Sequence, residues 1–323
     1  MTFLKSAIKD TVLWLYWYPF RWLVRAIPPL ARYRIARILA RLTYWLGWKK
    51  KPYLEELERI RTLAGGGDVN AWLLEALCHR WMTELDVFLF DRFNPENTPE
   101  LMGCQGLEHL DAGLQKGRGV MLLFAHFGAN QMVMPAIGHR GYTMSQLSAN
   151  PLVWVEKRPN QHFSPMARKA LALRWELELA LPVTHVDIFG SIKGAFSCLK
   201  RNQVLGIAMD GAGGKEIVEV DFLGRKANFS VGAVEIAHRT GCEVLPTFMV
   251  LDETGRYTLH ILPPMSLTRD EKGQLERQKT IQDFVIILEK YVLKHPGHYV
   301  HFLALRRFME LMEGDEPFLF DEK

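Results

Sequence analysis

Two short runs of apolar residues in the middle of the chain constrain its fold most strongly. Residues 119–125 read Gly-Val-Met-Leu-Leu-Phe-Ala, and residues 204–209 read Val-Leu-Gly-Ile-Ala-Met. An apolar run of this length, bounded by glycine or polar residues, is typical of a strand that is buried on both faces. Strands of that kind occur in parallel sheets whose faces are covered by helices. The two runs therefore predict an α/β fold.

Further strands and helices alternate along the rest of the chain. A helix is expected over 166–180, and another between Ser230 as its N-cap and Gly241 as the glycine that ends it. A third helix, 280–294, carries one apolar stripe and stops before Pro296-Gly297. The other expected strands are 218–222, 243–251 and 257–262, with 298–305 as a candidate last strand. This alternation predicts a mostly parallel central sheet covered by helices.

Residues 52–100 read as a helical lead-in to this α/β domain, which we expect to extend over 52–323. Apolar residues recur at the spacing of one helix face at Leu54, Leu57, Ile60 and Leu63. The glycines of 65–67 break the pattern, a second helix is expected over 71–90, and two prolines within 94–99 indicate a loop. The lead-in is thus predicted to consist of two helices.

Residues 1–51 differ from the rest of the chain in charge and in aromatic content. Eleven Lys and Arg residues stand against Asp10 alone, so this segment carries +10 in a chain whose net charge is +4. Ten Trp, Tyr and Phe residues lie between residues 14 and 48. Cations beside such rings suit the lipid headgroup layer. We expect two amphipathic helices, broken at Pro28-Pro29, that anchor the protein along the cytoplasmic face of a membrane.

This N-terminal segment fits neither a simple membrane span nor a secretory signal. Crossing the hydrocarbon takes ~20 apolar residues, and Arg21 and Arg25 interrupt the apolar run. No small-residue cleavage site follows that run. A basic arm that binds nucleic acid is the alternative, and the aromatic content argues against it.

The spacing of histidines and cysteines favours neither a metal site nor a disulfide framework. His295, His298 and His301 are close in sequence, but Pro296-Gly297 prevents a helix from aligning them. On a strand, residues 298 and 301 would face opposite sides. No Gly-x-Ser-x-Gly elbow supplies a serine-hydrolase nucleophile. The four cysteines form no CxxC pair and indicate reduced thiols: Cys78, Cys104, Cys198 and Cys242. We expect neither a metal nor a cofactor.

The polar segment after the first buried run is the main candidate for catalysis. His126-Phe-Gly-Ala-Asn-Gln131 follows Ala125 directly, where functional groups of α/β folds collect. A histidine at a helix N-terminus is kept neutral by the helix dipole, as a general base requires. Gly128 allows close backbone approach, and N–H groups nearby are suited to an oxyanion. With His126 in the turn and Gln131 on the helix, the two side chains can pair. A single histidine in a turn can also be structural.

A second polar segment follows the second buried run. It comprises the glycine-rich residues 210–215 and is followed closely by 220–225. The Walker pattern fails, because Met209 stands where its first glycine belongs and Glu216 where Ser or Thr should follow the lysine. We interpret the segment as a flexible loop beside a ligand, with Asp210 as either a ligand contact or a turn former.

Together these segments resemble the lipid A late acyltransferases, the lauroyl- and myristoyl-transferring branch of the lysophospholipid acyltransferase superfamily. That family has a His-x4-Asp/Glu signature after a strand, to which 126–131 is similar. Its later block, a strand ending in Asp and then Phe-Phe-Gly with a helix behind, is similar to 207–210, 221–224 and 231–246. Its C-terminal ending looks like His295-Pro296 and Arg306-Arg307-Phe308. The resemblance spans most of the chain, including the N-terminal segment.

The resemblance implies a glycerolipid acyltransferase-like fold and transfer of a fatty acyl chain to a hydroxyl of a lipid A-type glycolipid precursor. The donor would be a thioester of acyl carrier protein or of CoA, and the protein would lie at the cytoplasmic face of the bacterial inner membrane, in lipopolysaccharide biosynthesis. His126 would be the general base, with Gln131 beside it and no metal. The residues expected to bind substrate are Gly128, Asn130, Arg168, Lys169, Arg174, Asp210, Gly224 and Arg225.

Two departures from the family pattern leave alternatives open. Gln131 stands where the family has a carboxylate, and His301 or Phe302 where it has Trp. An amide can orient a histidine but offers no charge. One alternative is acylation of another acceptor, such as an amino-lipid, glycolipid or pigment head group. The other is a non-catalytic homologue that binds acyl chains or the carrier.

The basic residues of the helix 166–180 also have two interpretations. Arg168, Lys169 and Arg174 can hold acceptor phosphates or the acidic surface of a carrier protein. They can equally form a solvated basic face.

Overall fold

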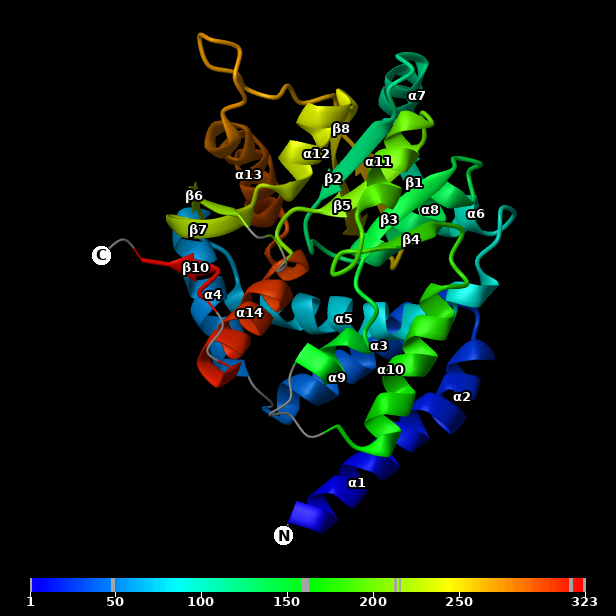
Figure 1. The fold of residues 1–323 in the computed structure, drawn as a ribbon. Helices are drawn as coiled ribbons and strands as arrows, with labels where there is room; N and C mark the ends of the chain where they lie inside the picture. The colour runs from blue at the N-terminus through cyan, green and yellow to red at the C-terminus, as the bar shows by residue number, and fades with distance from the viewer. Residues whose placement is uncertain are drawn as a thin grey trace.

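Helices and strands alternate through a computed structural model of the chain, which describes residues 2–47, 50–157, 163–211, 214, 216–313 and 316–321 (Figure 1). The helices are α1 (Thr2–Leu15), α2 (Arg21–Arg25), α3 (Pro29–Trp45), α4 (Lys50–Leu63), α5 (Val69–Val87), α6 (Thr98–Leu101), α7 (Leu107–Gln115), α8 (Val133–Gly138), α9 (Val153–Lys157), α10 (Pro165–Glu178), α11 (Lys193–Lys200), α12 (Gly232–Thr240), α13 (Arg277–Lys294) and α14 (Val300–Glu313). The strands are β1 (Met102–Gln105), β2 (Val120–Phe124), β3 (Met144–Ser148), β4 (Thr184–Asp187), β5 (Val204–Ala208), β6 (Ile217–Phe222), β7 (Arg225–Ser230), β8 (Glu243–Leu251), β9 (Tyr257–Ile261) and β10 (Leu319–Phe320).

The central sheet is mostly parallel, as the sequence predicts. Its seven strands lie in the order β1-β9-β8-β2-β5-β3-β4. Among the described strands of this sheet, only the pair β8 and β9 is antiparallel, because a short loop joins them directly. The two apolar runs form β2 and β5, which are parallel neighbours with Phe124 opposite Ala208.

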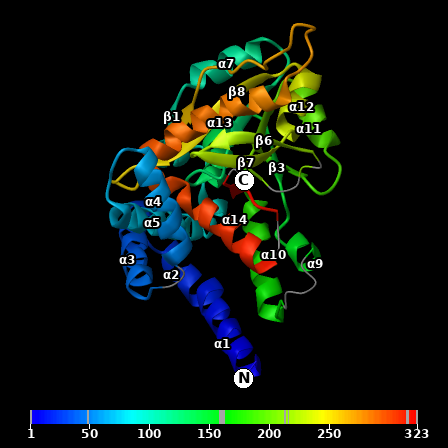
Figure 2. The same ribbon diagram turned by 90° about the vertical axis from the view of Figure 1, so that its left-hand side faces the viewer.

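Helices cover both faces of the central sheet. Because consecutive side chains of a strand point to opposite faces, the residues of β2 alternate between two hydrophobic cores. Val120, Leu122 and Phe124 of β2 belong to one hydrophobic core, together with residues of α3, α5, α7, α8 and α10. Met121 and Leu123 belong to a second core, which α11, α12 and α13 complete. Burial on both faces explains why β2 has no polar residue (Figures 1 and 2).

A small antiparallel sheet of β10, β7 and β6 lies apart from the central sheet (Figure 1). The strand predicted over 218–222 is present as β6, but it pairs with β7 and not with the parallel strands. The turn between them consists of Leu223 and Gly224, both with positive φ, of 51° and 68°. Two such residues form the tight hairpin turn that matches the twist of paired strands.

The N-terminal helices break at Pro28, as predicted. Helix α1, a π-helical turn at Tyr16–Phe20 and α2 follow one another, and α3 begins at Pro29, a position where proline is favoured. Helix α3 packs along α5, where Arg32 and Asp86 form a buried ion pair. Trp17 is also buried in the first hydrophobic core. Helix α1 projects from the rest of the molecule next to α10 (Figures 1 and 2).

Several large apolar side chains of the N-terminal helices are exposed. Trp22 is 66% exposed and Trp45 is 84% exposed, and the others are Ile8, Val12, Trp14, Leu15, Leu23, Ile38, Leu42 and Leu46. Within the described ranges, every helix is too short or too polar to pass through a bilayer.

Some local predictions were wrong. Residues 298–305, the candidate last strand, enter helix α14 after one 3-10 turn at Pro296–His298. The helix is favoured because Val300 and Ala304, one turn apart, face the first core, whereas Phe302 and Leu303 face the second. In α4, Leu63 is exposed, and the buried face includes Tyr53 instead.

The predicted termini of α12 are partly correct. Gly241 ends the helix in the left-handed conformation, with φ of 66°, as predicted. The N-cap is Val231, one residue after the predicted Ser230. The hydroxyl of Ser230 still accepts a hydrogen bond from the N–H of Gly232, the first residue of the helix. All four cysteines are free thiols in the described part of the chain.

Candidate active site

Strand register brings His126 and Asp210 together at the carboxyl end of the central sheet. Because Phe124 lies opposite Ala208 in the parallel pair of β2 and β5, the residues two positions further on are level with each other. The Met209 N–H donates to the Phe124 carbonyl at 2.8 Å and continues the pairing past the strand ends. The turns that carry both polar residues therefore start from the rigid centre of the sheet.

The Asp210 carboxylate holds His126 through two contacts. Its Oδ1 lies 2.7 Å from His126 Nδ1, and its Oδ2 accepts the His126 backbone N–H at 2.8 Å. The hydroxyl of Tyr299 donates to the same Oδ2 at 2.9 Å. The Asp210 side chain is fully buried, while that of His126 is 41% exposed. A carboxylate accepts from Nδ1–H, so the lone pair of the neutral ring lies on Nε2.

The electrostatics of this pair correct one sequence expectation. His126 precedes a short 3-10 turn, Asn130–Met132, and α8 begins only at Val133, so no helix dipole acts on the ring in the predicted way. Burial lowers the pKa of His126, but the charge and hydrogen bond of Asp210 outweigh burial and raise that pKa above its ordinary value. A base of raised pKa is a stronger proton acceptor, and its neutral fraction grows as the pH increases.

The exposed edge of His126 faces two adjoining cavities. Phe302 stacks on the imidazole, with ring centroids 4.9 Å apart and planes 6° from parallel. One cavity, of about 530 Å³, is lined largely by apolar side chains: Phe124, Met134, Leu147, Trp154, Leu171, Ile188, Ile207 and Met309. We call it the apolar cavity. Its chemistry suits a hydrocarbon chain.

The second cavity is smaller and more polar, with a volume of about 250 Å³. Among its lining residues are His79, Arg80, Thr83, Glu84 and His301, and we call it the polar cavity. The two cavities share His126, Asn130, Gln131, Arg174, Phe302 and Leu305. His126 thus lies where an apolar and a polar space meet.

Gln131 lies near His126 but pairs with other residues. Its Nε2 donates to Glu178 Oε1 at 3.1 Å, and its Oε1 accepts from Arg174 at 3.3 Å. Arg174 also donates to Glu178 at 3.1 Å and to Glu84 at 3.5 Å. The partner of the His126 ring is therefore Asp210, and the predicted pairing of His126 with Gln131 is not present.

Gly128 is required by the path of the backbone. Its φ is 59°, and a Cβ there would lie 2.4 Å from the Met249 carbonyl oxygen. Its N–H donates to the His298 carbonyl at 2.8 Å. The amides of His126 and Gly128 are thus both occupied, which corrects the expectation that such amides are free for an oxyanion.

The other predicted binding residues fall in three places. Arg168 and Lys169 are exposed on α10 and line neither cavity. Gly224 belongs to the β6–β7 turn, and Arg225 forms a buried ion pair with Glu56 of α4, so neither is brought to His126. Asn130 lines both cavities. Of the glycine-rich loop, residues 212, 213 and 215 lie outside the described part.

Three features of the site were not predicted from the sequence. They are the hydrogen bond between His126 and Asp210, the Tyr299 hydroxyl that donates to Asp210, and the Glu178 carboxylate that pairs with Gln131. A signal for the first was present, because each of the two residues follows a buried strand of a parallel sheet. Adjacent parallel strands place their carboxyl ends at one edge. Tyr299 and Glu178 come from distant helical segments, and nothing in their local sequence indicates the contact.

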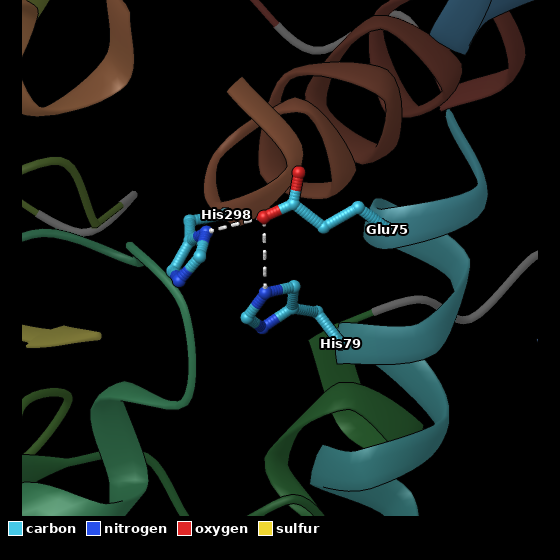
Figure 3. Close-up of side chains that lie close together, drawn as sticks. All are labelled: Glu75, His79 and His298. Carbon is cyan, nitrogen blue, oxygen red and sulfur yellow. Dashed lines mark ion pairs between the residues drawn. The ribbon is translucent and has the colours of Figure 1, made fainter. Parts of the chain in front are cut away.

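A second group of titratable side chains lies beside the polar cavity. Glu75 and His79 of α5 face His298, and their nitrogen and oxygen atoms lie within 4.8 Å of one another (Figure 3). In the sequence, His298 stands out only as one of three neighbouring histidines, with His295 and His301. The close approach of Glu75 was not foreseen, because it depends on how α5 packs against the 296–298 turn.

A family model matches most of the chain. A family model described as bacterial lipid A biosynthesis acyltransferase matches residues 77–309, which is more than half of the chain. The matched region begins within α5 and ends within α14, so it includes His126, Gln131 and Asp210. Among curated proteins, no sequence matches the chain.

Proposed function

This chain belongs to the bacterial lipid A biosynthesis acyltransferase family, and we propose that it moves a fatty acyl chain from a thioester to a hydroxyl of a lipid A-type precursor with His126 as general base. The family supports acyl transfer to a lipid precursor. The observation that carries the role of His126 is its hydrogen bond to the buried Asp210 carboxylate at the junction of the two cavities.

The proposed reaction needs one base and no covalent enzyme intermediate. Nε2 of His126 takes the proton of the acceptor hydroxyl while its oxygen attacks the thioester carbon. The C–S bond then breaks, and the protonated ring returns the proton to the leaving thiolate. Asp210 holds Nδ1–H throughout and stabilises the imidazolium, as the aspartate does in a Ser-His-Asp triad. No metal or cofactor enters these steps.

The two cavities suggest how the substrates are arranged. The apolar cavity is proposed to receive the acyl chain, because its lining of aromatic and aliphatic side chains matches a hydrocarbon. The polar cavity would receive the acceptor head, next to Arg174 and Asn130. In this arrangement the carbonyl carbon and the hydroxyl meet beside His126.

Arg306 is proposed to stabilise the oxyanion that forms during attack. It lines the apolar cavity, and its positive charge acts on the pKa of His126 by lowering it. Its buried Nε has no hydrogen-bond partner among the described residues. A cation placed beside a developing negative charge stabilises the transition state more than the ground state.

The donor is proposed to be acyl carrier protein, with CoA as the alternative. Arg168 and Lys169 are exposed on α10, and the neighbouring helix face borders the apolar cavity at Leu171. An exposed basic pair at this place suits the acidic surface of a carrier protein.

The N-terminal helices are proposed to rest on the inner membrane at its cytoplasmic face. Exposed Trp14, Trp22 and Trp45 lie among the cationic residues of this segment. Aromatic rings enter the interface, and Lys and Arg attract anionic lipid headgroups. The acceptor would then reach the polar cavity from the lipid phase.

The two alternative functions, a non-catalytic homologue and acylation of another acceptor, are supported to different degrees. A non-catalytic homologue was motivated by Gln131 in place of a carboxylate, but Asp210 supplies a carboxylate to His126 from another strand. We therefore favour catalysis. Acylation of an amino-lipid, another glycolipid or a pigment head group stays as an alternative for the acceptor.

The acceptor is identified by lipid mass spectrometry of the bacterium that carries this gene. Deletion should remove one acyl chain from one lipid, and the wild-type gene should restore it while His126→Ala does not. If every lipid keeps its mass after deletion, the proposed acyl transfer is wrong.

A further inference from the structure

We propose that Glu75 is a positioning residue, which holds the turn after His126 in place through the side chain of His298. The inference rests on the proposed function, because the effect of Glu75 is measured as a change in the rate of catalysis at His126. Neither Glu75 nor His298 touches the reacting atoms in this account. Their effect passes through the backbone of residues 127–128.

Glu75 connects two buried histidines by one oxygen atom. Its Oε1 lies 3.3 Å from His298 Nδ1 and 3.7 Å from His79 Nε2 (Figure 3). The side chains of His298 and His79 are 1% and 8% exposed, while that of Glu75 is 37% exposed. Glu75 thus reaches from a partly exposed position on α5 to the two buried histidine rings.

The hydrogen bonding of His298 determines which role this group can have. The backbone N–H of Leu251 donates to His298 Nε2 at 3.1 Å, so Nε2 carries the lone pair. In a neutral imidazole the proton is then on Nδ1, which points at Glu75. Burial, with the electrostatic effect of the neighbouring His79 ring, lowers the pKa of His298 to about 3, so the His298 ring is neutral at physiological pH.

The same tautomer argues against a metal ion at this place. Three ligand atoms within 4.8 Å would otherwise suit zinc. A metal at Nδ1 needs the lone pair there, which would force an N–H at Nε2 against the Leu251 N–H. His298 therefore points an N–H, and not a lone pair, at the Glu75 carboxylate oxygen 3.3 Å away, without forming a regular hydrogen bond. Burial raises the pKa of Glu75, but the close approach of the His298 and His79 rings lowers that pKa by more, so the carboxylate is charged.

His298 contacts the catalytic turn directly. Its carbonyl accepts the Gly128 N–H at 2.8 Å, and its ring stacks on Phe127, with centroids 5.1 Å apart and planes at 25°. A Cβ at position 128 would lie 3.2 Å from the His298 ring. The two residues after His126 are therefore seated on His298.

The turn is consequently held from two sides. Asp210 fixes the ring and amide of His126, and His298 fixes the following two residues. The Glu75 oxygen 3.3 Å from His298 Nδ1 is the contact that favours this orientation of the His298 ring. A displacement of ~1 Å at a catalytic group can cost about 100-fold in rate, so loosening this seat should lower kcat.

The test compares three substitutions with matched chemistry in the full-length protein. Glu75→Gln keeps the length and an oxygen acceptor but loses the charge. Glu75→Asp keeps the charge but withdraws the acceptor by one methylene group. Glu75→Ala removes the acceptor. We expect Glu75→Gln to retain kcat within about threefold, and the other two to lose about tenfold in kcat with little change in KM.

Each other result overturns the inference. If Glu75→Asp keeps wild-type kcat and Glu75→Gln loses it, the charge matters and not the reach. If all three variants match wild type, Glu75 has no positioning role. Stoichiometric zinc in the purified wild-type protein, lost in Glu75→Ala, would replace positioning by metal binding. Glu75→Gln and Glu75→Asp keep the test open if Glu75→Ala does not fold.

Two controls separate this inference from the proposed function. Glu55→Ala removes an exposed carboxylate on α4 and should leave kcat unchanged. His126→Ala measures whether acyl transfer depends on His126 at all. If wild type and His126→Ala are equally active, the proposed function fails. If His126→Ala is inactive and the Glu75 variants match wild type, the positioning inference alone fails.

Discussion

His126 Nδ1 lies 2.7 Å from Asp210 Oδ1, although the two residues are 84 positions apart in the chain. The contact follows from the parallel pairing of β2 and β5, whose ends deliver both side chains to one edge of the sheet. It supplies the carboxylate that the local sequence around His126 lacks. The proposed catalysis by His126 depends on this pair.

Asp210→Asn should lower kcat by about 10²- to 10⁴-fold, because an amide cannot stabilise the imidazolium and can favour the wrong tautomer. The residual activity should also shift in pH. The base must be neutral, so the rate rises with pH through the pKa of His126. Asp210 raises that pKa against the effect of burial, so its loss should move the rise to lower pH.

The pH–rate profile of Asp210→Asn is measured against Asp221→Asn, which alters an exposed carboxylate on β6. The control should keep the wild-type rate and midpoint. An unchanged profile in Asp210→Asn would show that Asp210 does not set the protonation of His126.

Gln131→Glu should lower activity, although it restores the usual family residue. Gln131 Nε2 donates to Glu178 Oε1 at 3.1 Å, so a glutamate would place two carboxylates together in a buried setting. The double variant Gln131→Glu with Glu178→Gln restores a single charge beside Arg174 and should recover most of the rate. A sharp increase in the single variant would mean that the wild-type site lacks a needed carboxylate.

Leu171→Phe should shorten the acyl chain that the protein accepts. Leu171 lines the apolar cavity from α10, and a larger ring would fill part of its volume of about 530 Å³. The rates with donors of increasing chain length are compared with those of Leu179→Phe, at an exposed position at the end of the same helix. If both variants keep the wild-type chain-length profile, the acyl chain does not occupy this cavity.

Replacing Trp22 and Trp45 together by serine should weaken binding to anionic lipid vesicles by about tenfold or more, because both rings are exposed beside cationic residues. Vesicle sedimentation measures the bound fraction. Ile217→Ser, which removes an exposed apolar side chain from β6, is the control and should bind as wild type does. Equal binding of all three proteins would contradict the proposed membrane surface.

Stability should fall as the pH decreases from neutrality. Burial lowers the pKa of His298 to about 3 and of His301 to about 4. An unfolded histidine titrates near pH ~6.5, so the unfolded state binds more protons between these values. The stabilisation is complete above that unfolded value and is lost as the pH falls towards the folded one.

Thermal unfolding at several pH values between 7 and 5 tests this prediction. His301→Phe removes one of the two groups and should reduce the dependence of Tm on pH. An identical dependence in both proteins would show that folding does not lower the pKa of His301.

The sequence predicted four of the seven strands of the central sheet and missed β1, β3 and β4. The buried central strands were recognisable because they are short and almost wholly apolar. The runs at 119–125 and 204–209 form β2 and β5, and the expected strands at 243–251 and 257–262 are β8 and β9. The strand predicted over 298–305 was wrong because this segment is helical and its apolar residues pack into two hydrophobic cores. Over only eight residues, the apolar pattern of such a helix cannot be distinguished from that of a buried strand.

The site was less predictable than the sheet. His126 was identified from its place after a strand, and the strand end at Asp210 was also recognised. Their contact requires the strand order, which places β5 next to β2 and cannot be read from either segment alone. Gln131 was assigned to His126 by proximity in sequence, whereas Glu178 and Arg174 of α10 compete for its amide. Arg225 was predicted to bind substrate, but it forms a buried ion pair with Glu56 of α4.

Catalysis by His126 is measured by the rate at which the purified protein transfers a labelled acyl group from acyl carrier protein to a lipid extract. The comparison is between wild type and His126→Ala. We expect a loss of at least about 100-fold in the variant, because the acceptor hydroxyl then has no base. A variant rate within a few-fold of wild type would contradict catalysis by His126.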